Sequence, residues 1–229
     1  MTIDETTAHP YRSAPEPSPF EGDVVRVPYR DQTRMRLALP SGLAHGCIVI
    51  DPDAKDLIAV HCDGPQPRIH VVGGEIVLGW NPGSFGSWLR DVLRPWNRYV
   101  AIALHPAVEW TLAIHGGLAH FALDLAAGSV ARIDIHGGCS DVQLELPLPK
   151  ATVPIRIAGG AAKVVVQRPA ETGVALAASG GVAALRLDDQ RFGAIGGAAR
   201  LETRSLERDA PRYELQISGG AADLAIERA

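Results

Sequence analysis

A doublet of glycines recurs along this 229-residue chain, each time followed by a similar run of small and apolar residues. The first three steps between doublets are 21, 22 and 21 residues long. The doublets begin at Gly116, Gly137, Gly159, Gly180, Gly196 and Gly219. A repeat of this period indicates short structural units stacked on one another, because one unit alone cannot bury its apolar face. This period constrains the fold more than any other feature of the chain.

Each unit reads as about two strands and two corners. After the first doublet, Phe121, Leu123 and Leu125 alternate with smaller or polar residues, and a turn signal at 126–129 precedes the next apolar run. Alternation with a period of two gives each strand one buried face. Glycine suits the corners because it tolerates positive φ and has no Cβ to clash with the corner of a stacked neighbour. The sequence therefore predicts an all-β protein, a β-solenoid or roll built from Gly-Gly repeats of roughly 21 residues.

The residues before the repeats also read as β-structure. Short apolar or alternating segments between residues 24 and 62 are separated by turn signals such as those at 40–42 and 51–53. The segment 68–80 contains the doublet Gly73-Gly74, and we interpret it as a weak early copy of the repeat.

The chain divides into three predicted parts. Residues 1–22 form a polar, Pro-rich tail that we expect to be disordered. Residues 23–107 form an N-terminal β region, and residues 108–229 form the Gly-Gly repeat solenoid. A single continuous domain over 23–229 is the alternative.

One segment breaks the β pattern, and it predicts a short helix near 87–94. Trp88 and Trp96 fall on its apolar side, whereas Arg90 and Arg94 face the other way. The helix is interpreted either as a cap over an end or a face of the roll or as a docking element for a partner or a membrane surface. These four side chains are the candidate interaction residues.

Composition excludes several classes of protein. The chain is 46% hydrophobic but only 5% aromatic, and its net charge of −4 argues against nucleic-acid binding. Three cysteines without CxxC spacing are expected to be free thiols of a reducing compartment. We find neither a signal peptide at the N-terminus nor an apolar stretch long enough to span a membrane, so the expected location is the cytoplasm.

The histidines before two of the doublets are the best candidates for chemistry. His115 and His136 occupy the same place in successive units, which stacking would bring to about 5 Å from each other. Asp134 lies two residues before His136, and two imidazoles with a carboxylate could bind Zn²⁺ or act as an acid–base pair. Later units carry Ala or Ser in the equivalent place, which favours plain exposed corner residues. We therefore expect no catalytic residue, cofactor or metal, and these three residues are the metal candidates of an enzymatic alternative.

A recurring pattern resembles a known family. An isoleucine two residues before the doublet, with small and then alternating apolar residues after it, occurs at Ile114, Ile135, Ile157 and Ile217. It is similar to the bacterial toast-rack domains, a putative-adhesin family of uncharacterised β-repeat domains. The resemblance covers 108–229 well and 24–80 loosely. It implies the solenoid or roll, and it implies no catalytic residues.

These observations favour a non-enzymatic structural scaffold or protein-interaction module that presents a repetitive β surface. One alternative is a saccharide- or peptide-binding module that uses a strand face and aromatics such as Trp80 and Trp110. The other is the metal-dependent or acid–base enzyme with His115, His136 and Asp134. A protein partner or self-association is expected, because the last repeat would end in an open strand edge through which copies could pair.

Overall fold

The computed structural model describes residues 23–64, 66–80, 99–203 and 210–229. The predicted tail over 1–22 and the predicted helix near 87–94, with Trp88, Arg90, Arg94 and Trp96, lie outside the described residues. Within the described ranges every regular element is a β-strand, so the chain has the all-β repeat architecture that the glycine period predicts.

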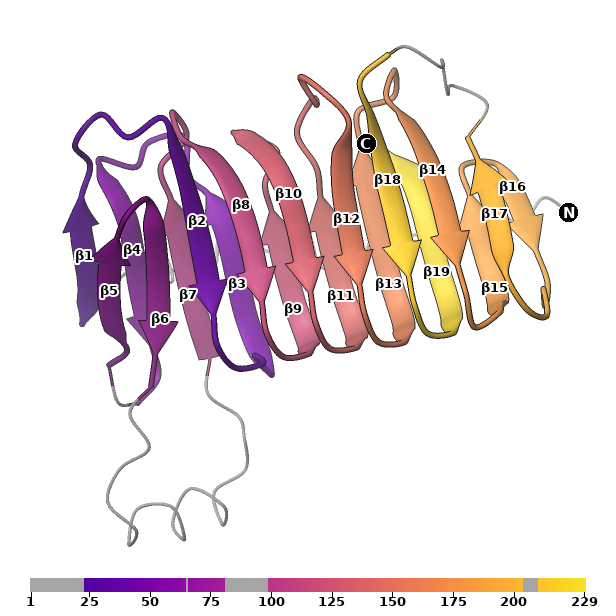
Figure 1. Cartoon of the computed structure of the whole chain (residues 1–229), viewed down its shortest axis with the longest axis horizontal. Coiled ribbons are helices and arrows are strands. Elements are labelled where there is room, and N and C mark those ends of the chain that lie inside the picture. The colour runs from indigo at the N-terminus through magenta and orange to yellow at the C-terminus, as the bar shows by residue number, and fades with distance from the viewer. Residues whose placement is uncertain (1–22, 65, 81–98, 204–209) are drawn as a thin grey trace, which may run out of the picture.

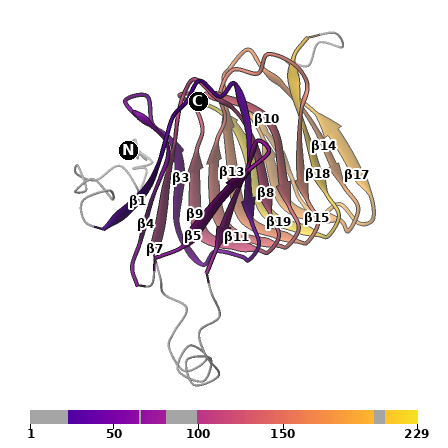
Figure 2. The ribbon, with the colours of Figure 1, turned by 60° about the vertical axis from the view of Figure 1, so that its left-hand side comes forward.

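The strands form two sheets that face each other (Figures 1 and 2). The first sheet contains, in spatial order, β1 (Val24–Pro28), β4 (Asp56–Cys62), β7 (Tyr99–Leu104), β3 (His45–Ile50), β9 (Leu118–Asp124), β11 (Cys139–Glu145), β13 (Ala161–Arg168), β19 (Ala221–Arg228), β15 (Val182–Leu187) and β16 (Gln190–Phe192). The second sheet contains β17 (Ala199–Glu202), β14 (Gly173–Ala178), β18 (Arg212–Ile217), β12 (Val153–Ile157), β10 (Ser129–Ile135), β8 (Glu109–Ile114), β2 (Arg34–Leu39), β6 (Glu75–Gly79) and β5 (Arg68–Val72). Strands of the N-terminal and the repeat regions therefore belong to the same two sheets.

The repeat unit is a rung with one strand in each sheet. The chain descends a strand of the second sheet, turns at a glycine corner and returns in the first sheet, as in β8–β9, β10–β11 and β12–β13 (Figure 1). Successive rungs pair in parallel and in register. The corners need glycine because a Cβ on Gly137 would lie 2.5 Å from the backbone nitrogen of Gly117, and one on Gly159 would lie 2.6 Å from that of Gly138.

Register turns the repeat into columns of buried side chains. Ile114, Ile135, Ile157 and Ile217 lie side by side across four strands of the second sheet, and all are buried. Each such side chain contributes about 1.5–3 kcal/mol by leaving water. Because a column repeats one shape, branched aliphatic residues fill the space between the sheets, and few aromatics are needed.

A left-handed residue follows each corner that leads into β9, β11, β13, β15 or β19. The third residue of each of these strands has positive φ, at 48° in His120 and 52–56° in the equivalents Asp141, Lys163, Ala184 and Asp223. Two consecutive side chains then point outward before the strand turns its next residue inward, as the burial patterns show. Strict alternation, on which the sequence reading relied, misses this bulge.

The C-terminal rung is not at the end of the stack. β18 lies between β12 and β14, and β19 lies between β13 and β15 (Figure 1). The prediction of an open terminal strand at the last repeat is therefore wrong. The described sheets end instead in β1, β5, β16 and β17, each antiparallel to its neighbour.

Two glycine doublets differ from their predicted roles. Gly73-Gly74 forms the turn of the β5–β6 hairpin, with φ of 57° and 84°, so the interpretation of 68–80 as an early repeat is wrong. The early corner is at Gly42, where a Cβ would meet the Gly117 carbonyl oxygen at 2.6 Å. The doublet at Gly196 takes the chain from the first sheet back to the second, opposite to the other corners, and a Cβ there would meet nothing within 4 Å.

Candidate functional site: the corner groove and its histidine pairs

The predicted histidine pair is stacked at the corners. The ring centroids of His115 and His136 lie 4.7 Å apart with 6° between the ring planes, and both side chains are exposed. The distance follows from the spacing of neighbouring rungs.

Asp134 is engaged elsewhere. Its Oδ2 accepts a hydrogen bond from Nε of Arg132, and that bond holds the pKa of the Arg132 guanidinium above its ordinary value. Among the described residues, no three His, Cys, Asp or Glu side chains are grouped closely enough to hold a metal ion. Of the three residues predicted to form a metal or acid–base cluster, only the two histidines are therefore seen in contact with each other.

A second histidine pair lies in the first sheet, just after the corners, and the sequence analysis did not identify it. His45 and His120 stack with centroids 5.0 Å apart, and Nδ1 of His120 lies 2.7 Å from Oδ2 of Asp141. The usable signal was the spacing from glycine, because His45 follows Gly42 by three residues, as His120 follows Gly117. Without a doublet at residues 41–42, this copy was not aligned with the others.

These residues begin a polar column, which continues from His120 along the left-handed positions. The column, which we call the bulge column, runs over neighbouring strands of the first sheet through His45, His120, Asp141, Lys163 and Asp223. Asp and His are among the residues that adopt left-handed φ most readily. The column therefore combines a backbone requirement with an exposed line of imidazole, carboxylate and ammonium groups.

A shallow groove lies beside this column, between it and the glycine corners. Two hollows of about 450 and 560 Å³ form it, and both are lined by Cys139. The residues at the positions just before the bulge column are small and form much of the lining. They are Ala44, Ala119, Ser140, Ala162, Ala222 and Ala183. We call this continuous feature, which crosses six rungs, the corner groove.

The groove does not contain a reactive thiol. Cys139 is buried, and burial raises the pKa of its thiol to about 12. The nucleophilic form of cysteine is the thiolate, which is scarce at neutral pH when the pKa is that high. Cys139 is therefore not a candidate nucleophile.

The aromatic residues considered for ligand binding are placed unfavourably. Trp110 is fully buried between the sheets, and its Nε1 donates a hydrogen bond to the His105 carbonyl oxygen at 3.0 Å. Trp80 is partly buried and packs against the core. The expectation that Trp110 helps to bind a saccharide or peptide is wrong.

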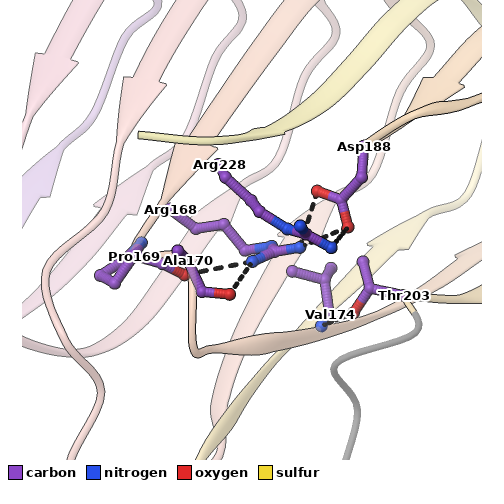
Figure 3. A network of polar contacts seen from close by, with 7 residues as sticks. All are labelled: Arg168, Pro169, Ala170, Val174, Asp188, Thr203 and Arg228. Carbon is purple, nitrogen blue, oxygen red and sulfur yellow. Dashed lines mark hydrogen bonds and ion pairs between the residues drawn. The ribbon is translucent and has the colours of Figure 1, made fainter.

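A buried ion pair lies at the C-terminal end of the stack (Figure 3). Nη2 of Arg168 lies 2.8 and 2.7 Å from the two carboxylate oxygens of Asp188, and Nη1 donates to the carbonyl oxygens of Pro169 and Ala170. The side chain of Arg168 is fully buried, that of Asp188 is 6% exposed, and Arg228 approaches the same carboxylate at 3.4 Å. Desolvation lowers the pKa of the Arg168 guanidinium, against the pull of Asp188. Asp188 lies in the turn that follows β15, and no local sequence signal indicates that Arg168 is its partner.

Comparison with known proteins supports the fold alone. No protein-family model and no curated protein matches the chain. A solved structure of a "putative cell adhesion protein" from Clostridium sporogenes matches with a TM-score of 0.65 and 17% identity, over 90% of this chain and 98% of the other. A "putative adhesin" from Bacteroides fragilis matches with a TM-score of 0.33 and 9% identity, over 92% and 99% of the two chains. In the described residues, no helix has the length and apolar character needed to cross a membrane.

Proposed function

We propose that this chain is a non-enzymatic protein-interaction module that binds an extended segment of a partner protein along the corner groove. The observation that carries the proposal is the regularity of the groove. Small residues recur on six rungs and a left-handed residue follows on five of them, so the small floor and the bulge column beside it run in line along the stack.

The groove suits a polypeptide. Its floor of glycine and alanine lets a partner backbone approach closely, because no side chain rises from it. The bulge column beside it offers charges of both signs, from Asp141, Lys163 and Asp223. Complementary charges of this kind fix register and orientation more than they add affinity.

The comparisons add support of a general kind. The Clostridium sporogenes protein with the same fold is named for cell adhesion, which is an interaction and not a catalytic role. We also propose membership of the toast-rack family, on the glycine pattern together with the two-sheet stack. The cytoplasm remains our proposed location, on the small number of cysteines and their lack of the spacing of a disulfide framework.

Blocking the groove tests the proposal. Ala162 and Ala222 are exposed neighbours on its floor, so the variant Ala162→Arg/Ala222→Arg fills it while the buried columns stay intact. Gln216→Arg, on the outer face of the second sheet, is the matched control. Proteins retained from an extract of the native cells by the wild type and the control, but not by the groove variant, would support the proposal. An identical set on all three, or no retained protein, would contradict it.

The scaffold reading calls for a different measurement. Light scattering behind size exclusion, over a concentration series of the full-length protein, reports self-association directly. Assemblies that grow with concentration and persist in the groove variant would favour a scaffold over a module that binds a partner in the groove.

A further inference from the structure

The slot that holds the C-terminal rung is formed by two rungs that are consecutive in the chain. β12–β13 and β14–β15 follow each other in sequence, yet β18–β19 separates them in both sheets (Figure 1). All four pairings across the slot are parallel. The last rung has therefore been inserted between neighbours rather than added to an end.

The two walls of the slot present equivalent surfaces. Val164 of β13 and Leu185 of β15 both lie opposite Leu224 of β19, from its two sides. They are 21 residues apart in the chain, which is the repeat period. The slot is thus defined by the repeat, and any strand with the same pattern and length fits it equally well.

The inserted rung consists of β18 and β19, the last two strands that the structure describes. In the slot it buries an unbroken set of side chains, which a rung from another copy would bury in the same way. They are Tyr213, Leu215, Ile217, Ala221, Leu224, Ala225 and Ile226.

The buried ion pair spans this rung. Arg168 ends β13 and Asp188 follows β15, so their contact passes over β19, which lies between the two strands (Figure 3). Arg228 of β19 reaches the same carboxylate. Asp188 therefore connects both walls of the slot to the inserted strand.

We propose that the slot between rungs β12–β13 and β14–β15 is an acceptor site for residues 210–229 of a second copy of this chain, so that copies exchange their C-terminal rungs. Exchange of an identical element restores the contacts of the closed monomer, so its net free-energy cost is low. It differs from pairing at an open edge because the incoming rung is flanked on both sides, as in donor-strand complementation.

Cross-linking between two full-length variants tests the exchange. Ala162 and Ala222 lie opposite each other in register on exposed positions of β13 and β19, at the separation of paired parallel strands, which suits a disulfide. An Ala162→Cys protein and an Ala222→Cys protein are mixed in their native state under mild oxidation. We expect a 162–222 disulfide between copies, identified by peptide mass spectrometry. It should form at least tenfold faster when both copies also carry Asp188→Asn.

The controls separate exchange from collision. Mixing Ala162→Cys with Gln216→Cys uses the same inserted rung, but residue 216 lies on the outer face of the opposite sheet. The double variant Ala162→Cys/Ala222→Cys should close its disulfide within one chain, which shows that the pair can react. A 162–222 cross-link between copies no more abundant than the 162–216 control, with or without Asp188→Asn, overturns the proposal.

Discussion

The middle of the stack and its C-terminal end are built from the same repeat but organised differently. In the middle, rungs β8–β9, β10–β11 and β12–β13 follow one another in space as in the chain, and the side chains buried in their columns are apolar. At the C-terminal end the last rung is inserted between two earlier ones, and Arg168, Thr172 and Thr203 are buried polar residues of the described chain.

The difference shows what a repeat leaves undetermined. Equal units pair with one another in any order, since each presents the same backbone pattern and similar buried side chains. A directional contact such as that between Arg168 and Asp188 distinguishes one neighbour from another, which an aliphatic column does not. The polar network therefore lies where the order of rungs departs from the order of the chain.

The largest expected effect is at the C-terminal end. Asp188→Ala leaves the guanidinium of Arg168 buried without its carboxylate, which should lower the free energy of unfolding by about 3–5 kcal/mol. Urea denaturation followed by circular dichroism measures the loss. Arg34→Ala, which removes a partly exposed ion pair with Glu109, should change stability by at most about 1 kcal/mol. Equal losses in the two variants would remove the contrast between the two regions.

The corners of the middle rungs should be the next most sensitive. Gly159→Ala places a methyl group 2.6 Å from a backbone nitrogen of the neighbouring corner, and such overpacking costs about 1–3 kcal/mol. Gly196→Ala, at the end of the stack, has no atom within 4 Å of the new methyl group and should be within about 0.5 kcal/mol of the wild type. Thermal denaturation of both variants compares their stabilities. A larger loss of stability in Gly196→Ala than in Gly159→Ala would contradict the prediction.

Alkaline pH should weaken the middle of the stack through Cys139. Burial raises the pKa of this thiol to about 12 in the folded state, so its contribution is complete below about pH 9 and is lost as pH rises through 12. Burial also raises the pKa of Tyr213, which acts in the same direction. We expect the wild type to lose up to about 1.4 kcal/mol per pH unit more than Cys139→Ala above pH 9. The midpoints of urea unfolding of both proteins at pH 7 and pH 10 measure the difference. An equal loss of stability in the wild type and in Cys139→Ala would contradict the prediction.

The smallest effect should be a gain in stability at the C-terminal end. Ala184 has a φ of 54°, which is unfavourable for a residue with a Cβ, so Ala184→Gly should raise the free energy of unfolding by up to about 1 kcal/mol. Ala183→Gly, at the preceding extended position, should lower it by about 0.5–1 kcal/mol. Changes of opposite sign in the melting temperatures of the two variants would support the bulge, and changes of the same sign would argue against it.

Much of the fold could be predicted because its causes are local. Glycine doublets mark the corners at Gly137 and Gly159, and the isoleucines before them mark the buried columns. The doublet at Gly73 was mistaken for a corner, because a hairpin turn at positive φ and a corner crowded by its neighbour both require glycine, for different reasons. Gly42 was missed because its copy carries only one of the two glycines.

Less of the candidate site could be predicted. The stacking of His115 on His136 follows from the period, but that of His45 on His120 depends on β3 lying beside β9, and the two strands are far apart in the chain. The groove was not predicted, because the left-handed bulge beside it breaks the strict alternation on which the sequence reading relied. Trp110 was assigned to binding because sequence does not tell which face of a strand is turned inward when both carry apolar residues.

The sequence by itself determined the rung, with its glycine corners, its paired strands and the alternation that buries one face of each, because these depend on residues close together in the chain. The tertiary structure alone decided the order in which the rungs stack, the place of the C-terminal rung and the contact between Arg168 and Asp188. The physical reason is that equivalent units compete for the same neighbours. The outcome then depends on long-range contacts whose partners carry no common local signal.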